Sequence, residues 1–322
     1  MTDKITVKYF LDKRLGVVTL RSFNGGNRMD SYEKAKDLEI KEIIPDSNDM
    51  ACTYIPDVTY ITKNGLDLHL QIIKPDRYVS EGEKYPLIVF VQGSGWYKQN
   101  CYMNVPQLSR FAQRGYVTAI LEYRDSGVSP FPAQVEDAKT GIRFLRKNAD
   151  EYGIDPDLVY IWGDSSGGHT ALLAGLTCDD KIFDTEDYGE YSCKVNGIID
   201  YYGVTDITDE KGFPDTPNSQ KADSPEGLLI GGKDVLANPE LSNPTIVMNH
   251  ISEEKSIVPI LIFHGTKDNI VSFRHSLRLY EKLMSCGKEV DFYAVKDAGH
   301  GGAPFWRKDV LDIVDDFIQA NM

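Results

Sequence analysis

The order of the apolar segments in this 322-residue chain predicts an α/β fold built on one mostly parallel, eight-stranded sheet. Short β-branched runs alternate with segments of helical periodicity, as repeated strand–helix–strand units require. Two runs flanking Lys63-Asn64-Gly65 have a hairpin signature and should form an antiparallel start of the sheet. The helices that connect parallel strands are expected on both faces of the sheet, so most strands should be buried.

Local patterns predict the individual elements. The clearest helix is expected from Phe131 to Tyr152, where apolar residues recur at helical spacing, and a last helix from about Pro304 to Ala320. Short apolar runs bounded by polar residues or glycine predict the strands. These strands are expected at 57–61, 66–73, 87–91, 117–122, 158–162, 196–201, 259–263 and 290–295.

The chain is expected to divide into an N-terminal extension, residues 1–55, and a main domain, residues 56–322. In the extension, Val7 to Phe10 and Gly16 to Leu20 have the pattern of short strands, and Ser31 to Lys41 has that of a helix. We expect the extension to pack on the main domain or to mediate a subunit contact.

The pentapeptide Gly163-Asp164-Ser165-Ser166-Gly167 has the form G-x-S-x-G. It follows the β-branched run 158–162 and precedes the apolar helical segment 170–176. Strand, sharp turn and helix in this order are the nucleophile elbow of an α/β-hydrolase, with Ser165 as the nucleophile. The helix start supplies free N–H groups beside the reacting atom. The prediction is therefore an α/β-hydrolase fold.

Three alternatives compete for the same motif. A G-D-S-G-G sequence also occurs in chymotrypsin-like proteases, but their order requires a histidine and then an aspartate before the serine. Only His69 precedes Ser165, and none of that family's motif surrounds it. A phosphate-binding loop would need a lysine that is missing here. The third alternative is a plain turn of glycine and serine.

The order serine, acid, histidine identifies the two partners of Ser165. His300 lies in a glycine-rich loop after the expected strand 290–295 and is the candidate base. Asp268 lies just beyond the strand 259–263 and is the candidate acid. The alternatives are an ordinary loop histidine and an aspartate that caps the next helix, Phe273 to Ser285. His169 and His264 are interpreted as structural.

The segment Gln92-Gly93-Ser94-Gly95-Trp96 follows a buried strand, at the position where lipases and esterases have an H-G-G-G-type motif. Backbone N–H groups of Ser94, Gly95 and Ser166 are the expected oxyanion donors. Gln in place of the first His leaves open how this loop is braced; the alternative is an ordinary Gly/Ser loop.

Aromatic residues near strand ends are candidates for the substrate pocket. Trp96, Tyr201, Tyr202 and Phe305 are expected to line it, although each type is more often found in a core. Residues 204–256 are rich in Pro, Asn, Asp and Gly and should form a small cap at the rim of the site. A solvated connection is the alternative for this segment.

With these residues in place, roughly residues 57–322 resemble an esterase-type α/β-hydrolase, most closely the bifunctional feruloyl and acetyl-xylan esterases, neighbours of the hormone-sensitive lipase family. The resemblance implies activity on acyl groups attached to plant polysaccharides or on small esters. The segments that resemble the family are Leu66–Leu70, Gln92–Trp96, Glu122–Arg124, Phe131–Ala138, Gly163–His169, Ser224–Glu226, Leu228–Gly232 and His300.

The expected function is that of a serine carboxylesterase, which forms an acyl-enzyme with a small-molecule or oligosaccharide ester. A peptidase or acyltransferase with the same triad is the alternative among enzymes. A peptidase of the prolyl-oligopeptidase type is disfavoured, because only about 55 residues precede the first expected strand and a propeller needs at least four blades. The alternative outside enzymes is a non-catalytic binding protein on a hydrolase scaffold.

Composition narrows the partners and the compartment. The net charge of -14 disfavours nucleic acid and anionic membrane surfaces. Five widely spaced cysteines without a C-x-x-C pair indicate reduced thiols, and the N-terminus lacks a signal peptide, so a cytoplasmic protein is expected. No metal or cofactor is expected, and a homo-oligomer is one option that the sequence leaves open.

Overall fold

The computed structural model forms two compact units, Met1–Asp49 and Met50–Met322. In the first unit, β1 (Val7–Asp12) and β2 (Val17–Ser22) pair antiparallel, as the two expected short strands. The helix expected from Ser31 to Lys41 lies, apart from its last residue, outside the described residues. The structure describes residues 7–12, 17–22, 41, 43–44, 46, 49–77, 82–178, 180–216 and 218–322.

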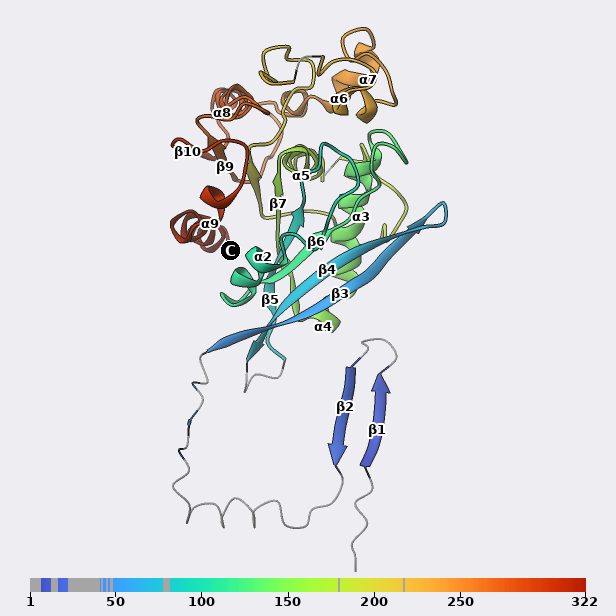
Figure 1. The fold of residues 1–322 in the computed structure, drawn as a ribbon, viewed down its shortest axis with the longest axis vertical. Coiled ribbons are helices and arrows are strands. Elements are labelled where there is room, and N and C mark those ends of the chain that lie inside the picture. The colour runs from blue at the N-terminus through green and yellow to red at the C-terminus, as the bar shows by residue number, and fades with distance from the viewer. Residues whose placement is uncertain are drawn as a thin grey trace, which may run out of the picture. The chain divides into compact units, whose positions relative to one another are not determined.

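The second unit is built on the predicted eight-stranded sheet (Figure 1). Its strands are β3 (Met50–Lys63), β4 (Leu66–Arg77), β5 (Tyr85–Val91), β6 (Val117–Leu121), β7 (Ile154–Asp164), β8 (Gly197–Tyr201), β9 (Ile260–Gly265) and β10 (Val290–Val295). The strand order is β10-β9-β8-β7-β5-β6-β4-β3. Strands β3 and β4 pair antiparallel, as do β4 and β6, and all other pairs are parallel.

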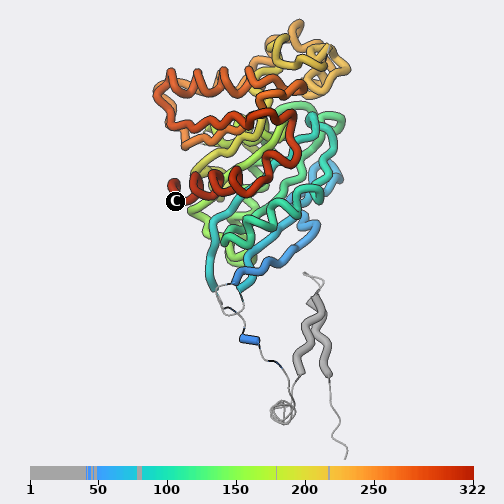
Figure 2. The backbone as a smooth tube through the Cα atoms, turned by 60° about the vertical axis from the view of Figure 1, so that its left-hand side comes forward, coloured from blue at the N-terminus to red at the C-terminus, as the bar shows by residue number. Residues whose placement is uncertain are grey.

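Helices cover both faces of this sheet (Figures 1 and 2). The helices are α2 (Val105–Ala112), α3 (Ala133–Lys147), α4 (Ala149–Tyr152), α5 (Ser166–Leu176), α6 (Pro225–Leu229), α7 (Pro239–Ser242), α8 (Arg274–Ser285) and α9 (Lys308–Ala320). The described residues also form short 3-10 helices, η1 (Asn243–Thr245), η2 (Val247–His250) and η3 (Ala303–Trp306).

Successive side chains of the central strand β5 alternate between the two hydrophobic cores, one on each face of the sheet. Leu87, Val89 and Val91 belong to the core cluster that contains residues of α3, α5 and α8. Ile88 and Phe90 belong to a second cluster, with residues of α2 and α9. Successive side chains of a strand point to opposite faces, so a strand covered on both faces has to be continuously apolar.

Two predicted helices differ from the structure in their bounds. The segment expected as one helix from Phe131 to Tyr152 forms α3 and α4, which are separated by Asn148. The segment expected from Pro304 to Ala320 forms η3 and then α9, with the extended Arg307 between them. In both places the helical spacing of apolar residues continues through a single residue, Asn148 or Arg307, whose backbone is not helical.

Residues 204–256 contain α6, α7, η1 and η2, and their apolar residues form most of a small third core cluster. This cluster includes Val204, Phe213 and Leu229 together with Trp96 from the loop after β5. The segment is therefore packed against the loop that was expected to hold the oxyanion, rather than being a purely solvated connection.

Candidate active site

The elbow is a sharp turn between β7 and α5, with Ser165 at its tip. Ser165 has a φ of 52°, a conformation in which a residue with a side chain is strained. A Cβ on Gly163 would collide with the backbone of Gly167, and one on Gly167 would collide with the carbonyl of Val91. The Ser165 N–H donates to the carbonyl of Tyr201 at 2.9 Å, which ties the turn to β8.

Ser165, His300 and Asp268 form one hydrogen-bonded chain. His300 Nε2 lies 2.9 Å from Ser165 Oγ, and His300 Nδ1 lies 2.7 Å from Asp268 Oδ2. The three residues follow β7, β10 and β9, whose carboxyl ends meet at one edge of the sheet. The arrangement allows the carboxylate to fix the imidazole tautomer that accepts the serine proton.

Asp268 is held by several donors in a buried position. The backbone N–H groups of Ile270 and Val271 donate to its Oδ1 at 3.0 and 2.9 Å, and His264 Nε2 lies 3.3 Å from its Oδ2. Burial raises the pKa of this carboxyl, but hydrogen bonds with His264 and His300 outweigh burial and hold the pKa well below its usual value. Asp268 is therefore ionised at neutral pH.

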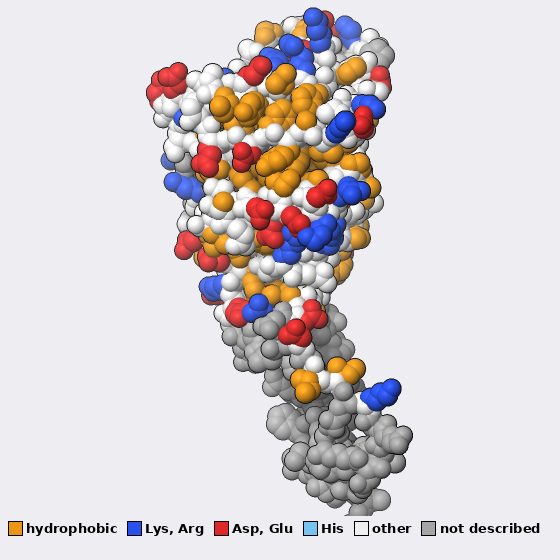
Figure 3. Space-filling model, turned by 90° about the vertical axis from the view of Figure 1, so that its left-hand side faces the viewer, with side chains coloured by type: hydrophobic (Ala, Val, Ile, Leu, Met, Phe, Trp, Pro, Cys, Tyr) orange, Lys and Arg blue, Asp and Glu red, His pale blue; other side chains and the backbone are white. Residues whose placement is uncertain are grey.

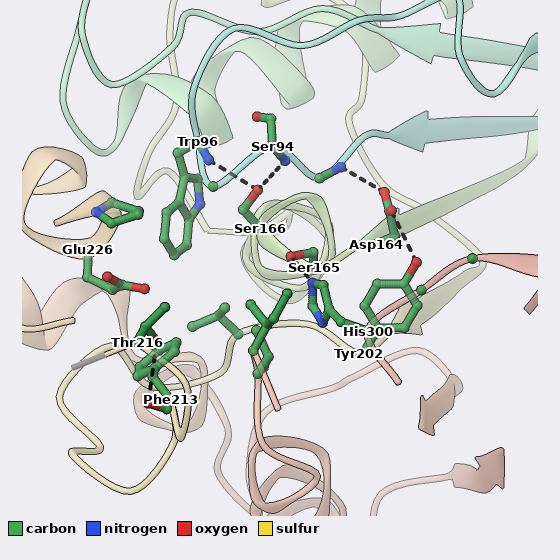
Figure 4. A pocket seen from close by; sticks show the side chains of 18 residues that line it. Ser94, Trp96, Asp164, Ser165, Ser166, Tyr202, Phe213, Thr216, Glu226 and His300 are labelled. Carbon is green, nitrogen blue, oxygen red and sulfur yellow. Dashed lines mark hydrogen bonds between the residues drawn. The ribbon is translucent and has the colours of Figure 1, made fainter. Parts of the chain in front are cut away.

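The loop after β5 is braced by the elbow itself. The Gly93 N–H donates to Asp164 Oδ1 at 2.7 Å, and Asp164 Oδ2 accepts a 3.3 Å hydrogen bond from the Tyr202 hydroxyl. Burial raises the pKa of Asp164. The N–H groups of Ser94 and Trp96 both donate to Ser166 Oγ, at 2.8 and 3.1 Å (Figure 4).

This bracing changes the expected set of oxyanion donors. The Ser94 N–H, expected to bind the oxyanion, instead donates to Ser166 Oγ. Among the described residues, no hydrogen bond engages the Gly95 N–H. The Ser166 N–H stands at the first position of α5, where no intrahelical acceptor is available. Gly95 and Ser166 are thus the two better candidates of the three.

His169, which was expected to be structural, holds the Trp96 side chain in place through a hydrogen bond. The Trp96 indole N–H donates to His169 Nδ1 at 3.2 Å, and His169 Nε2 lies 2.9 Å from the carbonyl oxygen of Thr245. Burial lowers the pKa of His169 to about 4, so the ring is neutral and Nε2 holds its proton. One face of the site is thereby linked to η1.

These elements enclose a pocket of about 390 Å³ around Ser165 (Figure 4). Of the four aromatic residues expected to line it, Trp96 and Tyr202 do so. The lining residues are Gly93, Ser94, Gly95, Trp96, Asp164, Ser165, Ser166, Tyr202, Val204, Phe213, Thr216, Pro225, Glu226, Ile270, Val271, His300, Gly301 and Gly302.

The other two aromatic predictions are wrong. Tyr201 and Phe305 are fully buried in the core on the α2 and α9 face of the sheet, with ring centroids 5.5 Å apart. Tyr201 ends β8 and shares the face of Ile199, because side chains two residues apart on a strand point the same way. Tyr202 follows the strand with a φ of 43°, and its ring joins the same cluster at 6.1 Å from that of Tyr201. Phe305 lies in η3, beneath Tyr202 at a centroid distance of 4.5 Å.

Several lining residues were not expected from the sequence. Phe213, Thr216 and Glu226 belong to the 204–256 segment, where no motif indicated a role in a pocket. Asp164 is the variable residue of the G-x-S-x-G pentapeptide, and its carboxylate positions the Gly93 N–H. The only available signal for Glu226 was its place in the Ser224-Pro225-Glu226 segment of the family resemblance.

Other features of the described residues bear on cofactors and location. Within the described ranges, no group of three or more His, Cys, Asp or Glu side chains is arranged to hold a metal ion. None of the five cysteines, all of which lie among the described residues, forms a disulfide bond. No helix in the described part of the chain has the length and apolar character needed to cross a membrane. On the face shown in Figure 3, acidic and basic side chains are interspersed.

The sheet, the elbow at Ser165 and the hydrogen-bonded chain to His300 and Asp268 define an α/β-hydrolase of the esterase type. The BD-FAE family model matches residues 70–283, more than half of the chain, and the protein belongs to this family. The match confirms the resemblance to feruloyl and acetyl-xylan esterases that the sequence motifs predicted.

The chain is also similar to proteins that are named as esterases and to solved esterase structures. Esterase LipC of Mycobacterium tuberculosis is 26% identical over 219 residues, 67% of this chain and 53% of LipC. A truncated carbohydrate esterase from gut microbiota has a TM-score of 0.73 at 25% identity, covering 87% of this chain and 99% of that one. A bifunctional GH43-CE protein of Bacteroides eggerthii has a TM-score of 0.72 at 26% identity, and the match covers 86% of this chain and 38% of that one. The chain spans about half the length of the curated relatives it matches.

The hydrogen bonds to the Ser166 hydroxyl predict that this side chain stabilises the fold, apart from any role in catalysis. Replacing Ser166 by Ala leaves the N–H groups of Ser94 and Trp96 without their acceptor, which should lower the free energy of unfolding by about 1–3 kcal/mol. Urea denaturation measures this. The control is S109A, whose hydroxyl only donates to a helix carbonyl, with an expected change within about 0.5 kcal/mol. Equal effects of the two variants would contradict the bracing role.

The lowered pKa of Asp268 predicts a pH dependence of stability. A carboxyl with a lower pKa in the folded chain stabilises the fold above its unfolded value, 3.8, and this stabilisation is lost as the pH falls through the folded value. Asn at this position has no such contribution. The free energy of unfolding of D268N should therefore fall less steeply than that of the wild type between about pH 5 and about pH 3. Parallel curves from urea denaturation would refute this.

Proposed function

We propose that this protein is a serine carboxylesterase that hydrolyses acyl esters through an acyl-enzyme on Ser165. The supporting observation is the continuous hydrogen-bonded chain from Asp268 through His300 to Ser165, with distances of 2.7 and 2.9 Å. A serine hydroxyl is a weak nucleophile until a base takes its proton, and neutral imidazole suits that task near physiological pH. The ionised Asp268 stabilises the imidazolium that forms.

In the first half of the proposed reaction, Ser165 Oγ attacks the ester carbonyl carbon while its proton passes to His300 Nε2. The carbonyl oxygen becomes negative and is stabilised by the N–H groups of Gly95 and Ser166. When the tetrahedral intermediate collapses, the alcohol leaves with the proton from His300. In the second half, a water molecule gives a proton to His300 and attacks the acyl-enzyme. The acid is then released as His300 returns that proton to Ser165 Oγ.

For the substrate, we propose acetyl or feruloyl esters, including those on plant carbohydrate. Membership of the BD-FAE family and the likeness to a protein named as a carbohydrate esterase support this class. A pocket of about 390 Å³ is within the size range of small-molecule sites. A net charge of -14 suits neutral esters better than anionic ones.

Removal of the Ser165 hydroxyl tests this proposal. S165A should lower kcat on p-nitrophenyl acetate by about 10⁴-fold or more, because attack and proton transfer both begin at this oxygen. The matched control is S252A, an exposed serine away from the pocket, which should keep wild-type kcat. Circular dichroism checks that both variants fold. Wild-type turnover by a folded S165A protein would overturn the proposal.

A further inference from the structure

Glu226 is a buried carboxyl in the pocket wall that has an unpaired oxygen. The residue is only 6% exposed, and its Oε2 has no hydrogen-bond partner among the residues that the structure describes. Figure 4 shows the carboxyl pointing from α6 into the pocket beside Trp96, on the other side of Ser165 from Tyr202. A buried polar atom without a partner destabilises the fold, so its presence needs an explanation.

Neither neighbouring charges nor the helix supplies that explanation. None of the described pocket-lining residues is Lys or Arg, so the carboxyl has no cation partner there. Glu226 occupies the second position of α6, where an acidic residue favours the helix dipole, but this helix has only five residues. Its N-terminus is already capped by the Ser224 side chain, which accepts from the Gly227 N–H at 2.9 Å.

A comparison with Glu240, which has the same position in another short helix, shows what is different about Glu226. Glu240 also occupies the second position of a short helix, α7, directly after Pro239 as Glu226 follows Pro225. Glu240 is exposed and lies outside the pocket. The helix position therefore accounts for an acidic residue, but not for one whose carboxyl is buried in the wall of the pocket.

We propose that Glu226 determines specificity by binding a hydroxyl group of the substrate, so that hydroxylated esters are preferred over plain ones. The inference rests on the proposed esterase function and names the substrate chemistry of the same pocket. A site that hydrogen-bonds a substrate hydroxyl rejects analogues without it, because its buried polar group then stays unpaired. Esters of sugars or other polyols place hydroxyls on the alcohol, and hydroxy acids place them on the acyl group.

The protonation of Glu226 is compatible with a hydroxyl ligand. Burial raises the pKa of Glu226 to about 7. Either of its forms can hydrogen-bond a hydroxyl, since the carboxylate accepts and the neutral acid also donates.

The test measures kcat/KM for two matched ester pairs. Glycerol monoacetate and ethyl acetate differ in hydroxyls on the alcohol, and methyl glycolate and methyl acetate differ in a hydroxyl on the acyl group. In E226L, the ratio of hydroxylated to plain ester should fall roughly 10- to 100-fold for at least one pair, which identifies the side that Glu226 contacts. E226Q, which retains polar groups of the same shape, should lower that ratio less. E240L should leave both ratios at their wild-type values.

Other outcomes separate the inference from the function on which it rests. If E226L lowers kcat/KM equally for both members of both pairs, the inference is wrong while the esterase proposal stands. Acetylcholine is assayed beside the two pairs. If E226L lowers kcat/KM for acetylcholine alone, Glu226 contacts a cation rather than a hydroxyl, and the inference is also wrong. Absence of wild-type turnover on every ester would overturn both proposals. Should E226L fail to fold, E226A takes its place, and unchanged ratios for both pairs in folded E226A would be the contradicting result.

Discussion

Ser165 has a backbone φ of 52°, which a residue with a side chain keeps only when its surroundings hold it there. Here Gly163 approaches Gly167, and Gly167 approaches Val91, so closely that neither glycine has room for a side chain. The hydrogen bond from the Ser165 N–H to the Tyr201 carbonyl fixes the turn against β8. The direction of the Ser165 hydroxyl therefore depends on the register of the three central strands β5, β7 and β8.

The residues on both sides of Ser165 extend this constraint to the oxyanion loop. Asp164 accepts from the Gly93 N–H, and Ser166 Oγ accepts from the N–H groups of Ser94 and Trp96. The elbow and the loop after β5 thus form one hydrogen-bonded unit. This explains how the loop keeps its shape without the histidine that begins the usual motif, and the two serines of the pentapeptide then have different tasks.

The sequence was sufficient for the sheet and for the three residues Ser165, His300 and Asp268, because strand order fixes which loops share one edge of the sheet. It was insufficient at two kinds of position. Tyr201 was assigned to the pocket because a strand end does not reveal which face its last side chain takes, and a shift of one residue reverses the face. Glu226 was missed because its burial depends on how the 204–256 segment folds back, which no local pattern encodes.

The account depends on the joint action of Ser165 and His300. Its most direct test is the position of the covalent adduct after treatment with diisopropyl fluorophosphate, located by mass spectrometry of peptides from the wild type and from H300A. The account predicts one adduct, on Ser165 of the wild type, and little or none in folded H300A over the same time. An adduct on another residue, or equally fast labelling of Ser165 without the imidazole, would contradict it.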